Sequence, residues 1–353
     1  MMQQDAGVSL ADGGRLAAAN YIGYFVGALW AMVQPARTDY AVRASLAVTA
    51  AATLAMAFAD GMLAYLALRA LAGVSSAWVL IHVSSWCAAR LALVDRPGLN
   101  GVVFAGVGAG IVFAGALCIT LMTLGAGSRT AWVLLGLAGF LVTGAVWPVV
   151  KEARSTIKVS LAGYQWTPDA LRLVACYGAF GIGYIIPATF VPVMAKAVIN
   201  DPAIFGWAWP VFGAAAVGST LMAGAFERRL KGRRLWMIST CVMALGVASA
   251  LFVDGLAGII GCALLVGGTF VVATLAGVQV AREVAGARAY VLVAAMTAAF
   301  AASQIAGPLI VSFLAERALG FGAALWSALV ALLLSAAALM IPLRGDKRLG
   351  EQL

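Results

Sequence analysis

Apolar stretches of about twenty residues recur along the whole chain, and short polar segments separate them. A helix of that length crosses the hydrocarbon core of a membrane. The pattern predicts eleven transmembrane helices, over 16–34, 42–59, 62–88, 100–123, 130–150, 170–194, 204–225, 235–253, 256–280, 290–313 and 320–342. Because the apolar runs are continuous rather than alternating, they argue against a transmembrane β-barrel. We therefore expect an all-α polytopic membrane protein.

The amino-acid composition supports this fold class. Of the 353 residues, 63% are hydrophobic and 10% are charged, with a mean hydropathy of +1.00. A soluble domain of this length could not bury so much apolar surface. The five cysteines are scattered through apolar runs without a CxxC pair or a histidine partner, so we expect neither a metal site nor a cofactor.

The positive charge gathers on one side of the predicted membrane. If the first helix runs from outside to inside, 17 of the 23 Lys and Arg residues fall in inside segments and four fall outside. Inside loops of membrane proteins carry such an excess. We expect a multi-pass protein of the cell (inner) membrane with a cytoplasmic C-terminus. The net charge of +9 then reflects topology, and we expect no nucleic-acid partner.

An internal repeat divides the chain. A gapless shift of 192 positions places Arg37 on Arg229, and it places Arg90 on Arg282. We interpret residues 1–150 as an N-terminal bundle of five spans, 151–168 as a cytoplasmic linker and 169–353 as a C-terminal six-helix bundle. Such repeats are typical of secondary transporters. Under this shift the helix over 170–194 has no counterpart after residue 1, so we expect that the first bundle lacks its first helix.

Arg69 is the sharpest candidate for function because it lies inside a predicted span, where an ionisable side chain is costly. Helical spacing places Tyr65, Gly73 and Ser76 on its face. This polar stripe predicts a substrate cavity, with Gly73 as a close-packing position. The alternative is an arginine whose side chain extends to the membrane interface.

The run ACYGAFGIGYIIPATFVPVMAKA, over 175–197, holds polar residues and helix breakers at helical spacing: Tyr177, Tyr184, Pro187, Thr189 and Pro192. The prolines predict a broken, kinked helix in which Thr189 satisfies freed backbone groups. We interpret it as a movable cavity wall, with Pro187 in a gating role. A glycine-rich packing helix is the alternative.

Other polar positions complete the candidate list. Asn20, Tyr24 and Gln304 are deep enough in their spans to line a cavity, or to hydrogen-bond between helices. In the basic loop ERRLKGRRL, the residues Arg228, Arg229 and Arg233 anchor the topology and are candidates for a cytoplasmic gate. The only histidine, His82, is expected to be structural, with proton transfer as a second reading because no carboxylate falls in the middle of a span.

Three segments of the chain, LAAANYIGYFVGAL, RALAGVSSAWVLIH and GAFGIGYIIPATFVPVMA, together resemble the YbfB/YjiJ branch of the major facilitator superfamily. In that resemblance Arg69 and Gly73 belong to the superfamily's arginine motif of the fourth helix. The first-half loop departs from the usual Gly-x-x-x-Asp-Arg pattern, and only Arg37, Asp39 and Arg43 remain. The resemblance implies a twelve-helix, two-bundle fold and a site between the bundles near the membrane midplane.

The resemblance and the repeat together predict a secondary active transporter rather than an enzyme. We expect alternating access for a small organic solute, with proton-coupled efflux as one form of it, in a monomer embedded in the lipid bilayer. No convergent set of catalytic groups is visible. The alternative is an inactive or N-terminally mis-started fragment of such a transporter.

Overall fold

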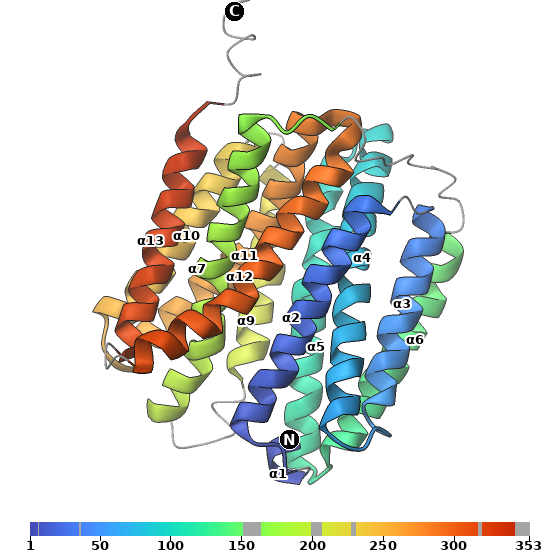
Figure 1. The fold of residues 1–353 in the computed structure, drawn as a ribbon, viewed down its shortest axis with the longest axis vertical. Helices are drawn as coiled ribbons and strands as arrows, with labels where there is room; N and C mark the ends of the chain where they lie inside the picture. Colours follow the sequence, from blue (N-terminus) through green and yellow to red (C-terminus); the bar gives the residue numbers. More distant parts are fainter. Residues whose placement is uncertain are drawn as a thin grey trace, which may run out of the picture.

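The computed structural model describes residues 1–5, 7–34, 37–150, 164–198, 207–226, 231–316 and 320–342. Within these ranges eleven long helices form a single elongated body (Figure 1). They are α2 (Leu10–Val33), α3 (Thr38–Ala55), α4 (Met62–Leu93), α5 (Asn100–Thr123), α6 (Ser128–Val150), α7 (Pro168–Val198), α9 (Ala208–Phe226), α10 (Gly232–Phe252), α11 (Gly255–Ala285), α12 (Ala289–Glu316) and α13 (Gly320–Met340). Short elements are α1 (Met2–Asp5), η1 (Pro97–Leu99) and η2 (Gly286–Arg288). Each predicted span overlaps one long helix, which confirms the all-α fold.

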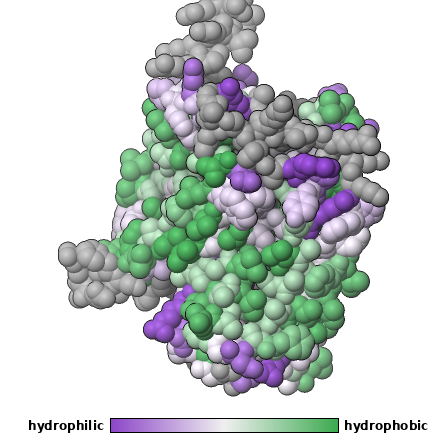
Figure 2. Space-filling model, turned by 45° about the vertical axis from the view of Figure 1, so that its right-hand side comes forward, coloured by the Kyte–Doolittle hydropathy of each residue, from purple (hydrophilic) through white to green (hydrophobic). Residues whose placement is uncertain are grey.

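Ten of these helices are long and apolar enough to cross a membrane, and α3 is the exception. The first turns of α3 contain Asp39 and Arg43, which lower its mean hydropathy. On the face that Figure 2 shows, apolar side chains cover the middle and hydrophilic side chains gather toward the two ends. That distribution is typical of a protein that spans a bilayer.

The helices form two bundles that lie side by side, α2 to α6 and α7 to α13 (Figure 1). The shift of 192 positions carries α4 onto residues 254–285, where α11 (Gly255–Ala285) lies, and carries α6 onto 320–342, where α13 lies. Helix pairing follows the same rule, since α2 packs on α4 as α9 packs on α11. The repeat seen in the sequence is therefore a repeat of structure. The linker predicted over 151–168 lies mostly outside the described residues.

Helix α7 is embedded in the second bundle, where it packs against α11, α12 and α13. No helix of the described chain takes the corresponding place in the first bundle. The apolar stretches of α5 and α6 are each 17% buried, whereas those of their counterparts α12 and α13 are 61% and 44% buried.

The sequence also predicts that Pro187 and Pro192 break and kink their helix. The predicted break is wrong, because α7 continues without interruption from Pro168 to Val198. The kink stays a prediction. A proline inside a helix removes one backbone hydrogen bond, and neighbouring helices in a membrane protein can compensate for that loss.

Glycine allows the helix axes to approach closely at two contacts. A Cβ atom added at Gly73 of α4 would clash with the backbone of α2 at Asn20. Between the bundles, a Cβ atom at Gly108 of α5 would lie 2.7 Å from the carbonyl oxygen of Gly213 in α9. The predicted packing role of Gly73 corresponds to the first contact, which positions Asn20 beside α4.

Candidate functional site

A cavity of about 490 Å³ lies between the two bundles. Helices α2, α3, α4 and α5 line it from the first bundle, and α7, α11 and α12 line it from the second. Its walls consist of Asn20, Tyr21, Tyr24, Leu46, Thr49, Ser76, Val79, Leu80, Phe104, Val107, Tyr184, Phe270, Val271, Thr274, Phe300 and Gln304. A cavity of this volume is within the usual range for a small-molecule site.

The cavity lies halfway along the bundles. Ser76, Tyr184 and Phe270 lie within about one helical turn of the centres of α4, α7 and α11, respectively. A solute bound there would be near the membrane midplane, which is where transporters with internal repeats hold their substrates.

The tertiary structure brings five of the nine cavity candidates together. Asn20, Tyr24, Ser76, Tyr184 and Gln304 all line the cavity, although they come from four different helices. The other four, Arg69, Tyr65, Tyr177 and Thr189, do not line it.

Arg69 lies just behind the wall. Its side chain is half-buried in α4, and its backbone carbonyl accepts a hydrogen bond of 3.0 Å from Asn20 Nδ2. Tyr21, which does line the cavity, lies within electrostatic range of the guanidinium. Arg69 is therefore connected to the cavity wall by the hydrogen bond from Asn20.

Tyr177 and Thr189 lie on other faces of α7. Tyr177 is buried in the second bundle, where its ring meets those of Phe180, Trp236 and Phe300 at 5.3–5.7 Å. Thr189 is exposed. The tyrosine face predicted for α7 is thus divided between core packing at Tyr177 and the cavity at Tyr184.

Tyr65 lines a different hollow of about 590 Å³, at the end of the first bundle near the N-terminus. Asp5, Asp60 and Arg129 also line it. This hollow is larger than the central cavity, but it is formed by the first bundle alone, so a movement of one bundle against the other would not open and close it.

Sequence reasoning missed the aromatic and hydroxyl walls of the cavity at Thr49, Phe104, Phe270, Thr274 and Phe300. A phenylalanine on an apolar helix is equally suited to lipid, to the core and to a cavity, so its sequence context holds no signal. In the part of the chain that the structure describes, no group of three or more His, Cys, Asp or Glu side chains could hold a metal ion.

His82 joins the two bundles. Its Nε2 atom and the hydroxyl of Tyr290 are 2.9 Å apart, and both residues are buried. The ring of His82 also lies 5.4 Å from that of Trp78, whose Nε1 donates to the Gly27 carbonyl. The sequence leaves His82 as a lone structural histidine, whereas the fold places it in a hydrogen bond between α4 and α12.

This contact lies on one side of the cavity. His82 is six residues beyond Ser76 toward the end of α4, a rise of about 9 Å. Tyr290 is in the first turn of α12, ten residues before Phe300. The hydrogen bond therefore connects the bundles between the cavity and the face where the sequence predicts the basic cytoplasmic loops.

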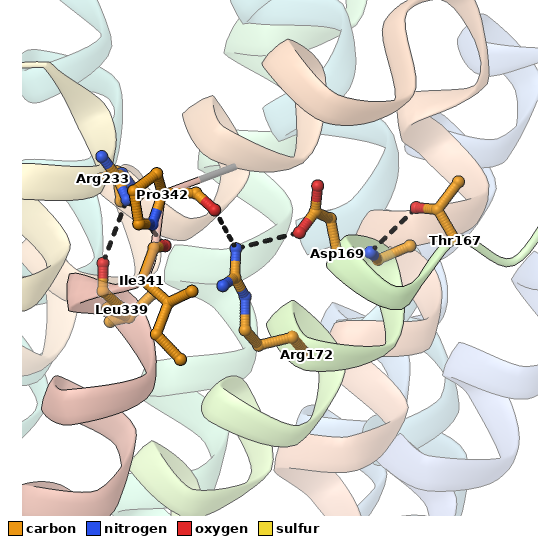
Figure 3. Close-up of polar contacts among 8 residues, drawn as sticks. Thr167, Asp169, Arg172, Arg233, Leu339, Ile341 and Pro342 are labelled. Atoms are coloured by element: carbon orange, nitrogen blue, oxygen red, sulfur yellow. Dashed lines mark hydrogen bonds and ion pairs between the residues drawn. The ribbon is translucent and has the colours of Figure 1, made fainter. Parts of the chain in front are cut away.

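The gating candidates lie in several places. Arg233, at the start of α10, donates to the carbonyls of Ile341 at 2.8 Å and Leu339 at 3.4 Å, at the end of α13 (Figure 3). Arg172 of α7 reaches the neighbouring Pro342 carbonyl and pairs with Asp169 at 3.0 Å.

The two arginines satisfy carbonyl groups that a helix end leaves without intrahelical partners, and their charge suits the negative end of the helix dipole. In this structure Arg233 thus joins helices of one bundle. Pro187 borders a small hollow with Phe212 and Cys262, and Arg228 and Arg229 lie outside the described residues.

Two pseudo-repeated helix bundles with a cavity between them at mid-depth define a membrane transport protein. A family model described as "Uncharacterised MFS-type transporter YbfB" matches residues 1–341, and the chain belongs to this family of the major facilitator superfamily. A search of curated protein sequences finds no match.

Among solved structures, the fold is similar to that of the major facilitator superfamily transporter FucP in the outward conformation. The TM-score is 0.67 and the sequence identity 10%, over 94% of this chain and 90% of that chain. At this identity the likeness concerns the fold.

Proposed function

We propose that this protein is a secondary active transporter that moves a small organic solute across the membrane by alternating access. The observation that supports it is the cavity of about 490 Å³ with walls from both bundles. Since each bundle supplies part of the wall, a movement of one bundle against the other changes access to the cavity without dismantling either bundle.

The inter-bundle contacts suit such a movement. On the basic side of the cavity, His82 and Tyr290 supply a direct side-chain hydrogen bond between α4 and α12. Breaking it separates two helices that line the cavity. We propose that this bond forms when the basic side is closed and breaks when that side opens.

We further propose a proton gradient as the driving force, in the direction of efflux. No Asp or Glu of the described residues lies in the middle of a spanning helix, whereas His82 is titratable and buried at the contact between the bundles. Its Nδ1 atom has no hydrogen-bond partner. A doubly protonated imidazole would place a second N–H donor and a charge in this buried site, which disfavours the closed contact.

Flux in reconstituted vesicles tests the proposal. A panel of radiolabelled small organic solutes would be followed in proteoliposomes, with and without an imposed pH gradient. We expect at least one solute to exchange above the rate of protein-free vesicles, and we expect Ser76→Trp, which fills the cavity, to abolish that exchange. Leu245→Trp is the matched control because Leu245 is 63% exposed on α10.

Equal flux in both tryptophan variants would show that the solute does not pass through this cavity. A flux that does not depend on the pH gradient would contradict proton coupling but would leave the proposed transport pathway intact.

A further inference from the structure

We infer that the cavity selects an uncharged solute with a flat aromatic ring, which stacks beside Tyr184 and Phe270 and hydrogen-bonds toward Ser76 and Gln304. This inference rests on the proposed function, since it assigns a substrate class to the same site.

As far as the described residues form them, the cavity walls lack formal charge. None of the described lining residues is Asp, Glu, Lys, Arg or His. A charged solute would leave water here without a counter-ion, and such a transfer is unfavourable. A cation is opposed further by the positive charge of Arg69, which lies behind the wall and within electrostatic range of Tyr21. For an anion, the Arg69 guanidinium lies behind the cavity wall rather than in it, so it is not in position to contact the bound solute.

One side of the cavity is a set of nearly parallel rings. The Tyr184 ring lies 4.9 Å from that of Phe270, with an angle of 23° between the planes, and 5.8 Å from that of Phe300, with an angle of 27°. The Phe270 ring continues the stack to Phe212 at 5.2 Å. Aromatic rings prefer such offset-stacked partners over aliphatic ones of the same area, so a flat ring in the solute extends an existing stack.

The cavity walls also offer polar groups. Ser76 of α4 lines the cavity, and so does Gln304 of α12, one helical turn from Phe300; among the described residues neither side chain makes a hydrogen bond. By contrast, the hydroxyl of Thr49 already bonds the Ser45 carbonyl and the Ser75 hydroxyl. A serine hydroxyl and an amide can each donate and accept, so together they match a neutral polar group such as a carboxamide.

A matched set of probes tests charge and flatness separately. The set is 2-naphthamide, 2-naphthoate, (2-naphthylmethyl)trimethylammonium and the saturated decahydronaphthalene-2-carboxamide. Binding to the detergent-purified protein would be measured by saturation-transfer NMR and by thermal shift. We expect 2-naphthamide to bind about ten-fold more tightly than the saturated amide, the scale that one favourable ring contact contributes. We expect it to bind at least about ten-fold more tightly than each charged probe, because those leave water without a counter-ion.

Variants locate the binding. Phe270→Leu should weaken 2-naphthamide about ten-fold and leave the saturated amide unchanged. Gln304→Leu should weaken both amides. Phe252→Leu is the matched control, because Phe252 is 67% exposed and packs on Trp326 far from the cavity walls.

Tighter binding of either charged probe, equal binding of the saturated amide, or no binding of 2-naphthamide at millimolar concentration would overturn the inference. Transport of a charged solute that Ser76→Trp blocks would overturn the substrate class and keep the proposed function. Binding of 2-naphthamide as described, with no solute crossing vesicles, would keep the class and overturn the proposed function.

Discussion

His82 of α4 and Tyr290 of α12 are separated by 208 positions in the chain, yet their side chains form a buried hydrogen bond of 2.9 Å between the two bundles. It lies between the central cavity and the basic face. In the first bundle, aromatic rings pack behind His82: the ring of Trp78 lies 5.4 Å from that of His82 and 4.7 Å from that of Trp30. In the alternating-access mechanism that we propose, opening of the cavity to the basic face breaks this bond.

Tyr290→Phe should therefore shift the protein toward opening on the basic face. A hydrogen bond between membrane helices contributes about 0.6 kcal/mol on average, so we expect about a three-fold change in the ratio of open to closed molecules. Distances between spin labels at Leu93 and Ile341, in a version without native cysteines, would report it. Tyr40→Phe is the control because Tyr40 is 72% exposed. An unchanged distance distribution in Tyr290→Phe would contradict the proposed closing role.

Arg69→Ala should reduce transport more than ten-fold without unfolding the protein, because it removes a charge that lies behind the cavity wall, on the residue to which Asn20 donates its hydrogen bond. Arg69→Lys keeps the charge and should retain part of the rate. Initial rates in proteoliposomes measure both. The control is Arg129→Ala, which removes an exposed arginine paired with Asp60 at 3.2 Å. A wild-type rate in Arg69→Ala would exclude Arg69 from the transport mechanism.

Gly73→Ala should destabilise the first bundle by about 1–3 kcal/mol, because the added methyl group overpacks the contact with the backbone of α2. The melting temperature in detergent would fall accordingly. Gly106→Ala on α5 is the matched control, since nothing lies within 4 Å of the added atom. That variant should keep or raise the melting temperature, because alanine has the higher helix propensity. Equal melting temperatures for the two variants would show that the α2–α4 contact is loose.

Asp5 is expected to make one end of the first bundle sensitive to acid. Burial alone would raise its pKa, but hydrogen bonds from the backbone amide and the hydroxyl of Ser128 lower the pKa below the ordinary 3.8. A lowered pKa means that the contact stabilises the fold above pH 3.8 and is lost as the pH falls through the lower, folded-state value.

Hydrogen exchange of the α6 N-terminus, compared between wild type and Asp5→Asn, checks this sensitivity. Protection should differ at pH 6 and converge toward pH 3, whereas Asp60→Asn should change little because its ion pair is exposed. Equal protection in wild type and Asp5→Asn at pH 6 would contradict the expectation.

The helices themselves were predictable from the sequence. A bilayer requires about twenty apolar residues per helix. The position of each span can therefore be predicted from its own residues, without knowledge of the neighbouring helices. The same is true of the repeat, because a gapless shift carries 62–93 onto 254–285, where α11 lies. The continuity of a helix was less predictable. Helix α7 continues through Pro187 and Pro192, where the sequence favours a break.

The candidate site was predictable only in part. Asn20 and Gln304 were identified because a polar group deep in a span is costly and therefore conspicuous. Ser76 was identified from its helical spacing to Arg69, and Tyr184 from the helical spacing of polar residues in the run 175–197. Tyr177 satisfies the same criterion but faces the core of its own bundle. The direction of a side chain around its helix depends on which helices surround it, and the neighbours of α7 lie about a hundred residues further along the chain.

The sequence by itself thus determined a helical membrane protein with two related halves, because the hydrophobic length and its repetition are local properties. Only the tertiary structure decided which aromatic rings line a cavity and which face lipid, since Phe270 and the exposed Phe252 are alike in sequence context and differ in their neighbours. It also decided that His82 meets Tyr290, because two buried polar groups gain by pairing wherever the fold brings them within reach.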